Sequence, residues 1–456
     1  MSPIELEVLV GDRLAGWLEI SPVPGRRSEL VEFEYDPGWL ADGFALSPEL
    51  PLRLGRQRPT LGRSLFGAFQ DAAPDRWGQR MIFERARREG LPKGELTEPR
   101  RLLLVPDRTR QGALRFRLDG SFLDQSPGSA PWSSLAELER VAADLAEGGD
   151  DWGAPDLLLR AGATSGGAQP KAAVDGEDGA LWLAKFPQRH APIDQGRWEQ
   201  ACMGVQREAG IVVAESKIVP VDEYNAIFAT RRFDRGAAGE RIPFVSFRTM
   251  LQLVDAGISG NPSYVELARE LRRWSAAPDE DRRELLRRAA VNAALESNDD
   301  HMRNFGLLRG PRGWRLSPAF DVNPAPGVRS DTPLVPGGST EHRDPLELVE
   351  HADAFGLSRA GAAREVASAV TAAARLREFA EEAGVDREAL SGGAAARLQA
   401  KLTELAARAR AAESLSTLPT ARSTESAASR CTVCGRPLRS AESIARGMGP
   451  GCARRA

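Results

Sequence analysis

A β-hairpin followed by a long helical region is the strongest fold signal in this chain. The apolar runs KAAV (171–174) and ALWLAKF (180–186) flank the turn-forming segment DGEDG, a pattern typical of two antiparallel strands. A helix at about 196–209 and further strands in IVVAESKIVPV and NAIFATRRF come next. From residue 244 onward the pattern is mostly helical, with helices expected at 262–274, 279–296, 356–384 and 386–411. The sequence therefore predicts a small β-rich lobe followed by a larger helical lobe.

The region before the hairpin has a different pattern. Residues 4–35 alternate apolar and polar side chains with Gly and Pro between the runs, which predicts short strands. Residues 65–88 become helical after Pro74. The segment DQSPGSAPWSS (124–134) is rich in Ser, Pro and Gly and is predicted to be a linker, with an amphipathic helix following at 135–147.

Length and composition exclude several classes of protein. A chain of 456 residues can bury a sizeable core in two or three domains, and a net charge of -3 gives no global basic field for wrapping nucleic acid. The N-terminus lacks the basic start and apolar core of a signal peptide, and no apolar run approaches the length of a membrane span. Three of the 4 Cys crowd the last 26 residues, which disfavours a secreted disulfide scaffold. We expect a cytoplasmic protein without a membrane partner.

The polar loop SNDDHMRNFGLL (297–308) follows a predicted helix and precedes a strand-like run. Asp299 and Asn304 are five residues apart, as in the catalytic loop of kinases, where the Asp accepts the substrate hydroxyl proton and the Asn binds Mg²⁺. Asp321 in PAFDVNP comes after the strand-like runs FGLL and GWRLS. A hairpin between the loop and Asp321 would bring a second metal ligand to Asn304, so this region predicts phosphoryl transfer.

The upstream lobe supplies the other parts of a phosphoryl-transfer site in the expected order. Lys185 lies on the second strand of the hairpin, Glu199 lies in the following helix, and the Gly-rich stretch GATSGGAQPK (162–171) precedes both. The chain has only five Lys among 61 basic residues, which favours a specific use for each. Each part also has an ordinary explanation: a Gly-rich turn, a solvent-facing Lys185, a helical acid or a capped loop. Together and in this order they favour a kinase.

The sequence resembles the HipA family of serine/threonine kinases, the toxin half of bacterial HipBA toxin–antitoxin pairs. The motifs that carry the resemblance are FALSPELPLR (44–53), APDRWGQRMI (73–82), GATSGGAQPKA (162–172), AKFP (184–187), RRFDR (231–235), NDDHMRNFGLL (298–308) and FDVNP (320–324). The resemblance implies an α+β fold with the two lobes of a protein kinase, preceded by a strand-rich HipA N-terminal subdomain. The implied boundaries are 1–123 for the subdomain, 135–235 for the β-rich N-lobe and 236–411 for the helical C-lobe.

The resemblance also implies roles for individual residues. Asp299 would be the catalytic base, and Asn304 and Asp321 would bind Mg²⁺. Lys185 would contact the ATP phosphates, and the backbone from Arg231 to Phe233 would form the adenine hinge. The loop that covers the nucleotide would run from Thr164 to Lys171 and include Gly166, Gly167 and Gln169. Either Thr164 or Ser165 would be the autophosphorylation point that silences the kinase.

His301 has two interpretations. It could assist proton transfer, as a histidine that titrates near neutrality can. It could instead brace the loop by hydrogen bonding. We favour the structural role, because Asp299 already fills the position of the base.

The resemblance implies ATP and Mg²⁺ as cofactors and a translation component, such as an aminoacyl-tRNA synthetase, as the phosphorylated target. A small helix-turn-helix antitoxin would be the partner and would bring the protein to DNA. One alternative is a small-molecule or lipid kinase on the same fold, which the strand-rich N-terminal region disfavours. The other is a non-catalytic scaffold in a DNA-repressor complex, which the intact Lys185, Asp299, Asn304 and Asp321 disfavour.

The C-terminal tail predicts a separate zinc module. After a Ser/Thr/Ala-rich linker (412–430), residues 431–456 contain Cys431 and Cys434 in a C-x-x-C turn and then Cys452. This pattern is typical of a zinc knuckle, although structural zinc takes four ligands and the tail has neither a His nor a fourth Cys. A disulfide is the competing interpretation, and Cys202 is expected to be a buried core thiol. The tail would dock to nucleic acid or protein.

Overall fold

The structure is a computed structural model. It describes residues 3–25, 28–146, 156–163, 167, 169–188, 193–223, 225–253, 263–297, 300–324 and 343–417. The chain divides into two compact units, residues 1–410 and residues 411–456. Within the described ranges, no helix is both long and apolar enough to cross a membrane.

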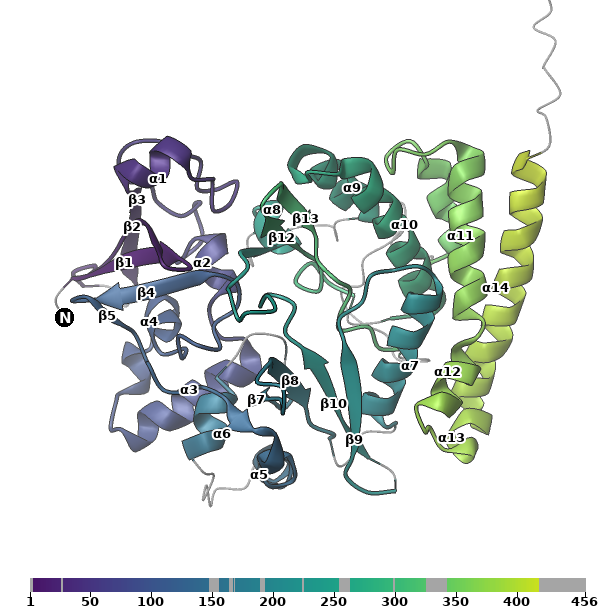
Figure 1. The fold of residues 1–456 in the computed structure, drawn as a ribbon, viewed down its shortest axis with the longest axis horizontal. Helices are drawn as coiled ribbons and strands as arrows, with labels where there is room; N and C mark the ends of the chain where they lie inside the picture. Colours follow the sequence, from purple (N-terminus) through teal and green to yellow (C-terminus); the bar gives the residue numbers. More distant parts are fainter. Residues whose placement is uncertain are drawn as a thin grey trace, which may run out of the picture. The chain divides into compact units, whose positions relative to one another are not determined.

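The N-terminal part of the chain forms an antiparallel five-stranded sheet with the order β3-β2-β1-β4-β5 (Figure 1). Alternate side chains such as Leu6, Val8, Leu18 and Ile20 are fully buried, which confirms the strands expected from the alternating pattern. The strands are β1 (Ile4–Val10), β2 (Arg13–Pro22), β3 (Glu29–Tyr35), β4 (Leu114–Leu118) and β5 (Ser121–Phe122).

Short helices fill the sequence between β3 and β4. They are α1 (Pro37–Asp42), α2 (Gly67–Asp71), α3 (Arg76–Arg88), the 3₁₀ turn η1 (Lys93–Glu95) and α4 (Glu98–Leu103). Helix α3 is the helix predicted after Pro74. Helix α2 was not predicted, because its five residues are too few to show a helical period.

A second five-stranded sheet has the order β6-β7-β8-β10-β9 and contains the predicted hairpin as β7 and β8. Its strands are β6 (Ala130–Pro131), β7 (Lys171–Asp175), β8 (Leu181–Lys185), β9 (Ser216–Pro220) and β10 (Ala226–Arg231), and the associated helices are η2 (Trp132–Ser134), α5 (Leu135–Ala146), α6 (Asp156–Ala161) and α7 (Gln195–Glu208). The interpretation of 124–134 as a linker was wrong in part, because β6 pairs in parallel with β7 and η2 leads into α5. A two-residue strand gives no sequence periodicity that could have predicted it.

The helical lobe surrounds a three-stranded sheet with the order β11-β12-β13. Its elements are β11 (Phe244–Ser246), α8 (Phe247–Met250), α9 (Tyr264–Trp274), α10 (Pro278–Ala294), β12 (Gly306–Gly310), β13 (Gly313–Leu316), η3 (Pro345–His351), α11 (Arg359–Ala373), α12 (Leu376–Glu382), α13 (Arg387–Ser391) and α14 (Gly393–Thr417). Helices α7, α10 and α11 share the largest hydrophobic cluster of the described residues. The hairpin β12–β13 lies between the polar loop and Asp321, as predicted.

Three of the helix predictions differ from the structure. The helix expected at 356–384 is interrupted at Ala374 and Arg375 and is therefore α11 and α12. The helix expected at 386–411 is interrupted at Gly392, which has an extended backbone, and is therefore α13 and α14. Helix α14 continues to Thr417, so the predicted linker at 412–430 begins within a helix. The Ala, Glu and Leu residues in AAESLST (411–417) are strong helix formers and outweigh the Ser and Thr that suggested a linker.

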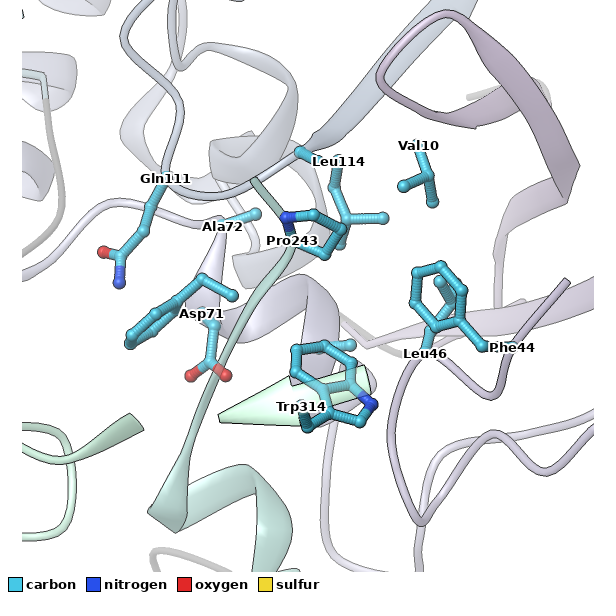
Figure 2. Close-up of a pocket in the computed structure, with 12 residues that line it drawn as sticks. Val10, Phe44, Leu46, Asp71, Ala72, Gln111, Leu114, Pro243 and Trp314 are labelled. Carbon is cyan, nitrogen blue, oxygen red and sulfur yellow. The ribbon is translucent and has the colours of Figure 1, made fainter. Parts of the chain in front are cut away.

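The N-terminal sheet and its helices contact the helical lobe through buried polar groups. Asp71, at the end of α2, accepts hydrogen bonds from the backbone N–H and the hydroxyl of Ser246, both at 2.7 Å. A cavity of about 20 Å³ lies beside this contact, among mostly apolar side chains such as Phe44, Leu114 and Trp314 (Figure 2). That volume is enough for about one water molecule, so the cavity is a packing defect of the junction and not a ligand site.

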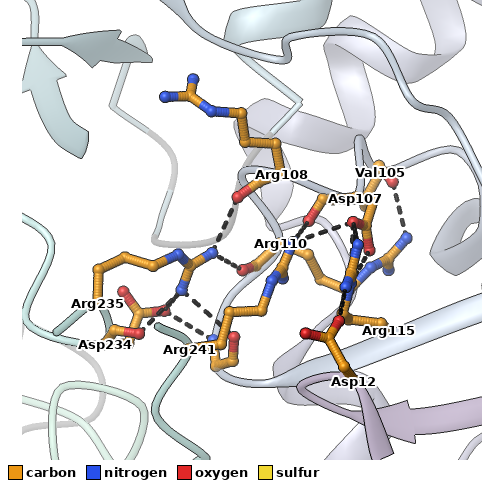
Figure 3. A network of polar contacts seen from close by, with 10 residues as sticks. Asp12, Val105, Asp107, Arg108, Arg110, Arg115, Asp234, Arg235 and Arg241 are labelled. Carbon is orange, nitrogen blue, oxygen red and sulfur yellow. Dashed lines mark hydrogen bonds and ion pairs between the residues drawn. The ribbon is translucent and has the colours of Figure 1, made fainter. Parts of the chain in front are cut away.

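A second junction joins residues 107–112 to the segment that follows β10 (Figure 3). Arg235 donates hydrogen bonds to the carbonyls of Arg108 (2.9 Å) and Arg110 (2.8 Å). Asp234 accepts one from the backbone N–H of Gly112 at 2.7 Å. The end of β10 is thus fixed against the N-terminal part of the chain.

Candidate active site

Lys185 lies at the centre of a buried cluster of charged side chains. It is the last residue of β8 and its side chain is only 5% exposed, which excludes the solvent-facing alternative. Its ammonium contacts Glu199 of α7, with Nζ 2.7 Å from Oε1, and forms a second ion pair with Asp321. The structure therefore brings together three side chains that the sequence placed on a strand, a helix and a later loop.

The charges of this cluster are coupled. Burial alone would lower the pKa of Lys185, but attraction to Asp321 and Glu199 outweighs it and raises that pKa. Burial would likewise raise the pKa of Asp321, and attraction to Lys185 outweighs it and lowers that pKa. Burial raises the pKa of Glu199 to about 7 despite the attraction to Lys185. Attraction within the cluster thus favours the charged forms of Lys185 and Asp321, whereas burial opposes ionisation of Glu199.

The backbone at Asp321 is held in a left-handed conformation, with φ of 59°. Asp tolerates this region better than most residues, but it still costs free energy that the surrounding contacts must offset. The preceding Phe320 packs against Phe233, with ring centroids 5.2 Å apart. This contact fixes the segment that carries Asp321 to the end of β10.

The polar loop is braced from both sides. Asp300 is buried and bonded to Tyr264, to Asn292 (Nδ2 to Oδ1, 3.1 Å) and to Arg343 (Nη2 to Oδ2, 3.2 Å). Burial raises the pKa of Asp300 to about 6 despite the attraction of Arg343. Sequence reasoning missed this anchor, since Asp300 is one of two adjacent acids and only the other fits the kinase spacing.

His301 and Asn304 lie on the downstream side of this loop. The Nδ1 atom of His301 accepts a hydrogen bond from the backbone N–H of Arg303 at 3.3 Å. The backbone carbonyl of His301 accepts one from the N–H of Asn304 at 2.9 Å. These contacts support the interpretation that His301 braces the loop. Asn304 is buried. Asp299 lies outside the described residues, so its role as base stays a prediction.

The predicted nucleotide loop is described only at its downstream end. Thr164, Ser165 and Gly166 lie outside the described residues. Gly167 has a φ of 97°, a conformation that disfavours other residues, and Gln169 donates to the carbonyl of Phe186 at 3.0 Å. Lys171 is 1% exposed, and its ammonium lies 3.1 Å from a carboxylate oxygen of Asp75. Asp75 comes from the N-terminal region, and sequence reasoning did not identify it.

The segment proposed as the adenine hinge is partly engaged in backbone hydrogen bonds. The N–H of Arg231 donates to the carbonyl of Glu215 at 2.8 Å, and that of Arg232 donates to Leu181 at 2.9 Å. The ring of Phe233 packs on Phe320. An adenine at this segment would therefore have to use other backbone groups than these two N–H donors.

Comparison with known families identifies the chain. A family model described as the HipA N-terminal domain matches residues 6–117, and one described as the HipA-like C-terminal domain matches residues 163–377. The chain belongs to the HipA family. None of the curated proteins matches it.

Solved structures agree with this assignment at the level of the fold. The chain is similar to HipA of Shewanella oneidensis MR-1, solved as a toxin–antitoxin complex of HipA, HipB and operator DNA, with 20% identity and a TM-score of 0.63. That match covers 89% of this chain and 97% of the other. A weaker match, with 12% identity and a TM-score of 0.33, is the Helicobacter pylori proinflammatory kinase CtkA, covering 54% of this chain and 94% of that one. The Shewanella match alone decides the fold: the protein has the two-lobed α+β fold expected from the HipA resemblance.

The tail matches a different family. Residues 421–456 match a family of unknown function, DUF6011. Cys431, Cys434 and Cys452 lie outside the described residues, so the zinc module stays a prediction. Cys202 is fully buried in α7, as expected, and burial raises the pKa of its thiol.

Proposed function

We propose that this protein is an ATP- and Mg²⁺-dependent serine/threonine protein kinase of the HipA type. The observation that carries the proposal is the buried Lys185 in contact with both Glu199 and Asp321. A strand lysine oriented by a helix glutamate and close to a metal-binding aspartate is the arrangement on which kinases depend. A buried lysine with two acidic partners is costly to maintain, which favours a function over a purely structural role.

The residues present fit the cofactors. Mg²⁺ keeps several waters and usually takes only one or two protein oxygens together with substrate phosphates, and Asn304 and Asp321 would supply such oxygens. Mg²⁺ would neutralise the phosphate charge.

The chain's own groups would do the rest by positioning and charge. Lys185, charged at neutral pH, would hold the α/β-phosphates, and Glu199 would orient it. Asp299 would accept the proton of the attacking hydroxyl, and the anchored Asp300 would keep that loop in place. In this proposal catalysis is mostly orientation and electrostatic stabilisation.

The regulation and partners are part of the proposal. Autophosphorylation would take place on Thr164 or Ser165, and the cellular target would be a translation component such as an aminoacyl-tRNA synthetase. The similar Shewanella HipA is in a complex with HipB and operator DNA. This supports a small helix-turn-helix antitoxin as the partner of the present protein, with DNA bound through it.

The test is incubation of the full chain with ATP and Mg²⁺, followed by intact-mass and peptide mass spectrometry. We expect phosphate on Thr164 or Ser165 in the wild type, and a loss of at least about 100-fold in rate for Asp299→Asn, Asp321→Asn and Lys185→Met. Glu137→Gln, at an exposed acid of helix α5, is the matched control and should be phosphorylated normally. If the wild type shows no phosphate and no ATP-induced thermal stabilisation, the kinase proposal is overturned in favour of a non-catalytic scaffold.

A further inference from the structure

A buried ion pair is one of the contacts between the N-terminal region and the described end of the nucleotide loop. Asp75 and Lys171 are 96 residues apart in sequence, and both side chains are at most 5% exposed. The carboxylate and ammonium lie 3.1 Å apart. Removing either partner of such a buried pair is strongly destabilising, because it leaves the other charge buried without a counter-ion.

Lys171 stands directly beside Lys185. The two residues are paired across β7 and β8, so their side chains leave the same face of the sheet. Like charges in directly opposed positions destabilise a sheet unless each has its own counter-ion. Lys185 has Glu199 and Asp321, and Lys171 has Asp75. The sheet can therefore bury two ammonium groups side by side.

Lys171 also faces the rest of the candidate site. Its charge contributes to the lowered pKa of Asp321 and opposes the rise in the pKa of Glu199, which places Lys171 within electrostatic reach of both. A Cβ placed on Gly167 would lie 3.5 Å from the ammonium nitrogen of Lys171, so this ammonium lies beside the described end of the nucleotide loop. Two ammonium groups on one face beside a glycine-rich turn suit a ligand with several phosphates.

Asp75 is itself held rigidly. It is the N-cap of α3 and accepts a hydrogen bond from the N–H of Gly78 at 2.6 Å. In the first turn of the same helix, Trp77 donates from its backbone to the carbonyl of Gly167 (3.3 Å) and from its indole to the carbonyl of Lys171 (2.8 Å). The start of α3 thus contacts Lys171 and Gly167 at both backbone and side-chain level.

We propose that Asp75 is a positioning residue of the nucleotide site: it holds the Lys171 ammonium beside Lys185, so that the two lysines together bind the phosphates of ATP. The proposal rests on the kinase function proposed above. It gives the HipA N-terminal domain of this chain a direct part in nucleotide binding.

The first test needs no nucleotide. The full chain is treated with formaldehyde and a mild reductant, and the methylation rate of each of its five lysines is followed by peptide mass spectrometry. Asp75→Asn should raise the methylation rate at Lys171 at least about fivefold, because the amine is no longer held against the carboxylate. Lys401, which is exposed on α14, is the internal reference. Asn caps helices as well as Asp does, and Asp75→Ser is a second substitution that keeps a cap.

The matched control is Asp71→Asn. Asp71 is also a carboxylate of the N-terminal region, partly buried and four residues from Asp75, and burial raises the pKa of both. Attraction to Arg303 of the polar loop opposes the rise in both pKa values, so both acids lie within electrostatic reach of Arg303. Asp71 binds Ser246 and not Lys171, so its replacement should leave the labelling of Lys171 unchanged. Equal labelling of Lys171 in the wild type and in Asp75→Asn would overturn the proposal.

The second test is a double-mutant cycle on the Kd of a non-hydrolysable ATP analogue with Mg²⁺, measured by calorimetry. Asp75→Asn should weaken binding about tenfold, and should have no further effect once Lys171 is replaced in Lys171→Met. Unchanged or tighter binding in Asp75→Asn, or an equal loss in both backgrounds, would overturn the proposal. If the wild type binds no nucleotide, the proposed kinase function fails, and so does the proposed binding of phosphates by Lys171 and Lys185. The methylation result would still decide whether Asp75 holds Lys171.

Discussion

Asp300 is the residue whose charge state should control the stability of the polar loop at 297–308. Its pKa is about 6 in the folded protein, raised by burial above the ordinary value near 4. An acid with a raised folded-state pKa contributes stability when protonated, and this contribution is lost as the pH rises through about 6.

Asp300→Asn should therefore remove a pH dependence that the wild type has. As the pH falls from 7 to 5, the free energy of unfolding of the wild type should increase by about 1 kcal/mol relative to that of the variant. Urea unfolding of both proteins at pH 7, 6 and 5 measures the difference. Parallel pH profiles would show that Asp300 is ionised throughout and that Arg343 determines its state.

The residues of the site differ in how far sequence could predict them. Lys185 and Asp321 stand in short motifs with kinase spacing, and the structure does bring them together. Asp75 carries no such signal, because its partner lies 96 residues away and neither residue type nor local pattern links them. Pairing of this kind depends on how the domains pack, which local periodicity does not encode.

The segment after β10 is held by a buried network of charged groups as well as by the packing of Phe233. Asp234 is paired with Arg232 (Nε to Oδ1, 2.8 Å) and Arg235 (Nη1 to Oδ2, 3.0 Å). It also accepts a hydrogen bond from the N–H of Gly112. The two arginines outweigh the effect of burial and hold the pKa of Asp234 well below its usual range. The contribution of Asp234 to stability is therefore constant above about pH 5 and is lost only on strong acidification.

Asp234→Asn should destabilise the protein by about 3–5 kcal/mol, because it leaves two buried guanidinium groups without their carboxylate. The midpoint of urea unfolding at pH 7 measures the loss. Asp178→Asn is the comparison, since it breaks a half-exposed pair with Arg231 and should leave the midpoint nearly unchanged. A similar small effect for both variants would mean that the segment is held by packing and not by charge.

At the level of elements, the hairpin strands and helix α7 were predictable, whereas breaks within the long helical segments and very short elements were not. The hairpin β7–β8 and helix α7 appear within one or two residues of their expected positions. The two-residue strand β6 and the five-residue helix α2 were missed, since both owe their conformation to neighbours distant in sequence. The end of α14 was misplaced because Ser and Thr were given more weight than Ala and Leu.

For the whole molecule, the main prediction concerns the independence of the tail. The hydrophobic clusters of the described residues all lie within residues 1–410. A chain ending at residue 417 should therefore unfold within about 2 °C of the full chain by scanning calorimetry. The full chain should contain zinc by elemental analysis, and both the shortened chain and Cys434→Ser should not. A zinc-free full chain would refute the zinc module.

Asp71 and Asp75 have a joint consequence for how related chains can vary. The first is bonded to Ser246 of the helical lobe and the second to Lys171 of the β-rich lobe, and only Ala72, Ala73 and Pro74 separate them. Four peptide units reach at most about 14 Å, so the covalent chain itself limits how far these two attachment points can separate. Homologous sequences that keep both acids should vary in the identity of the intervening residues but not in their number.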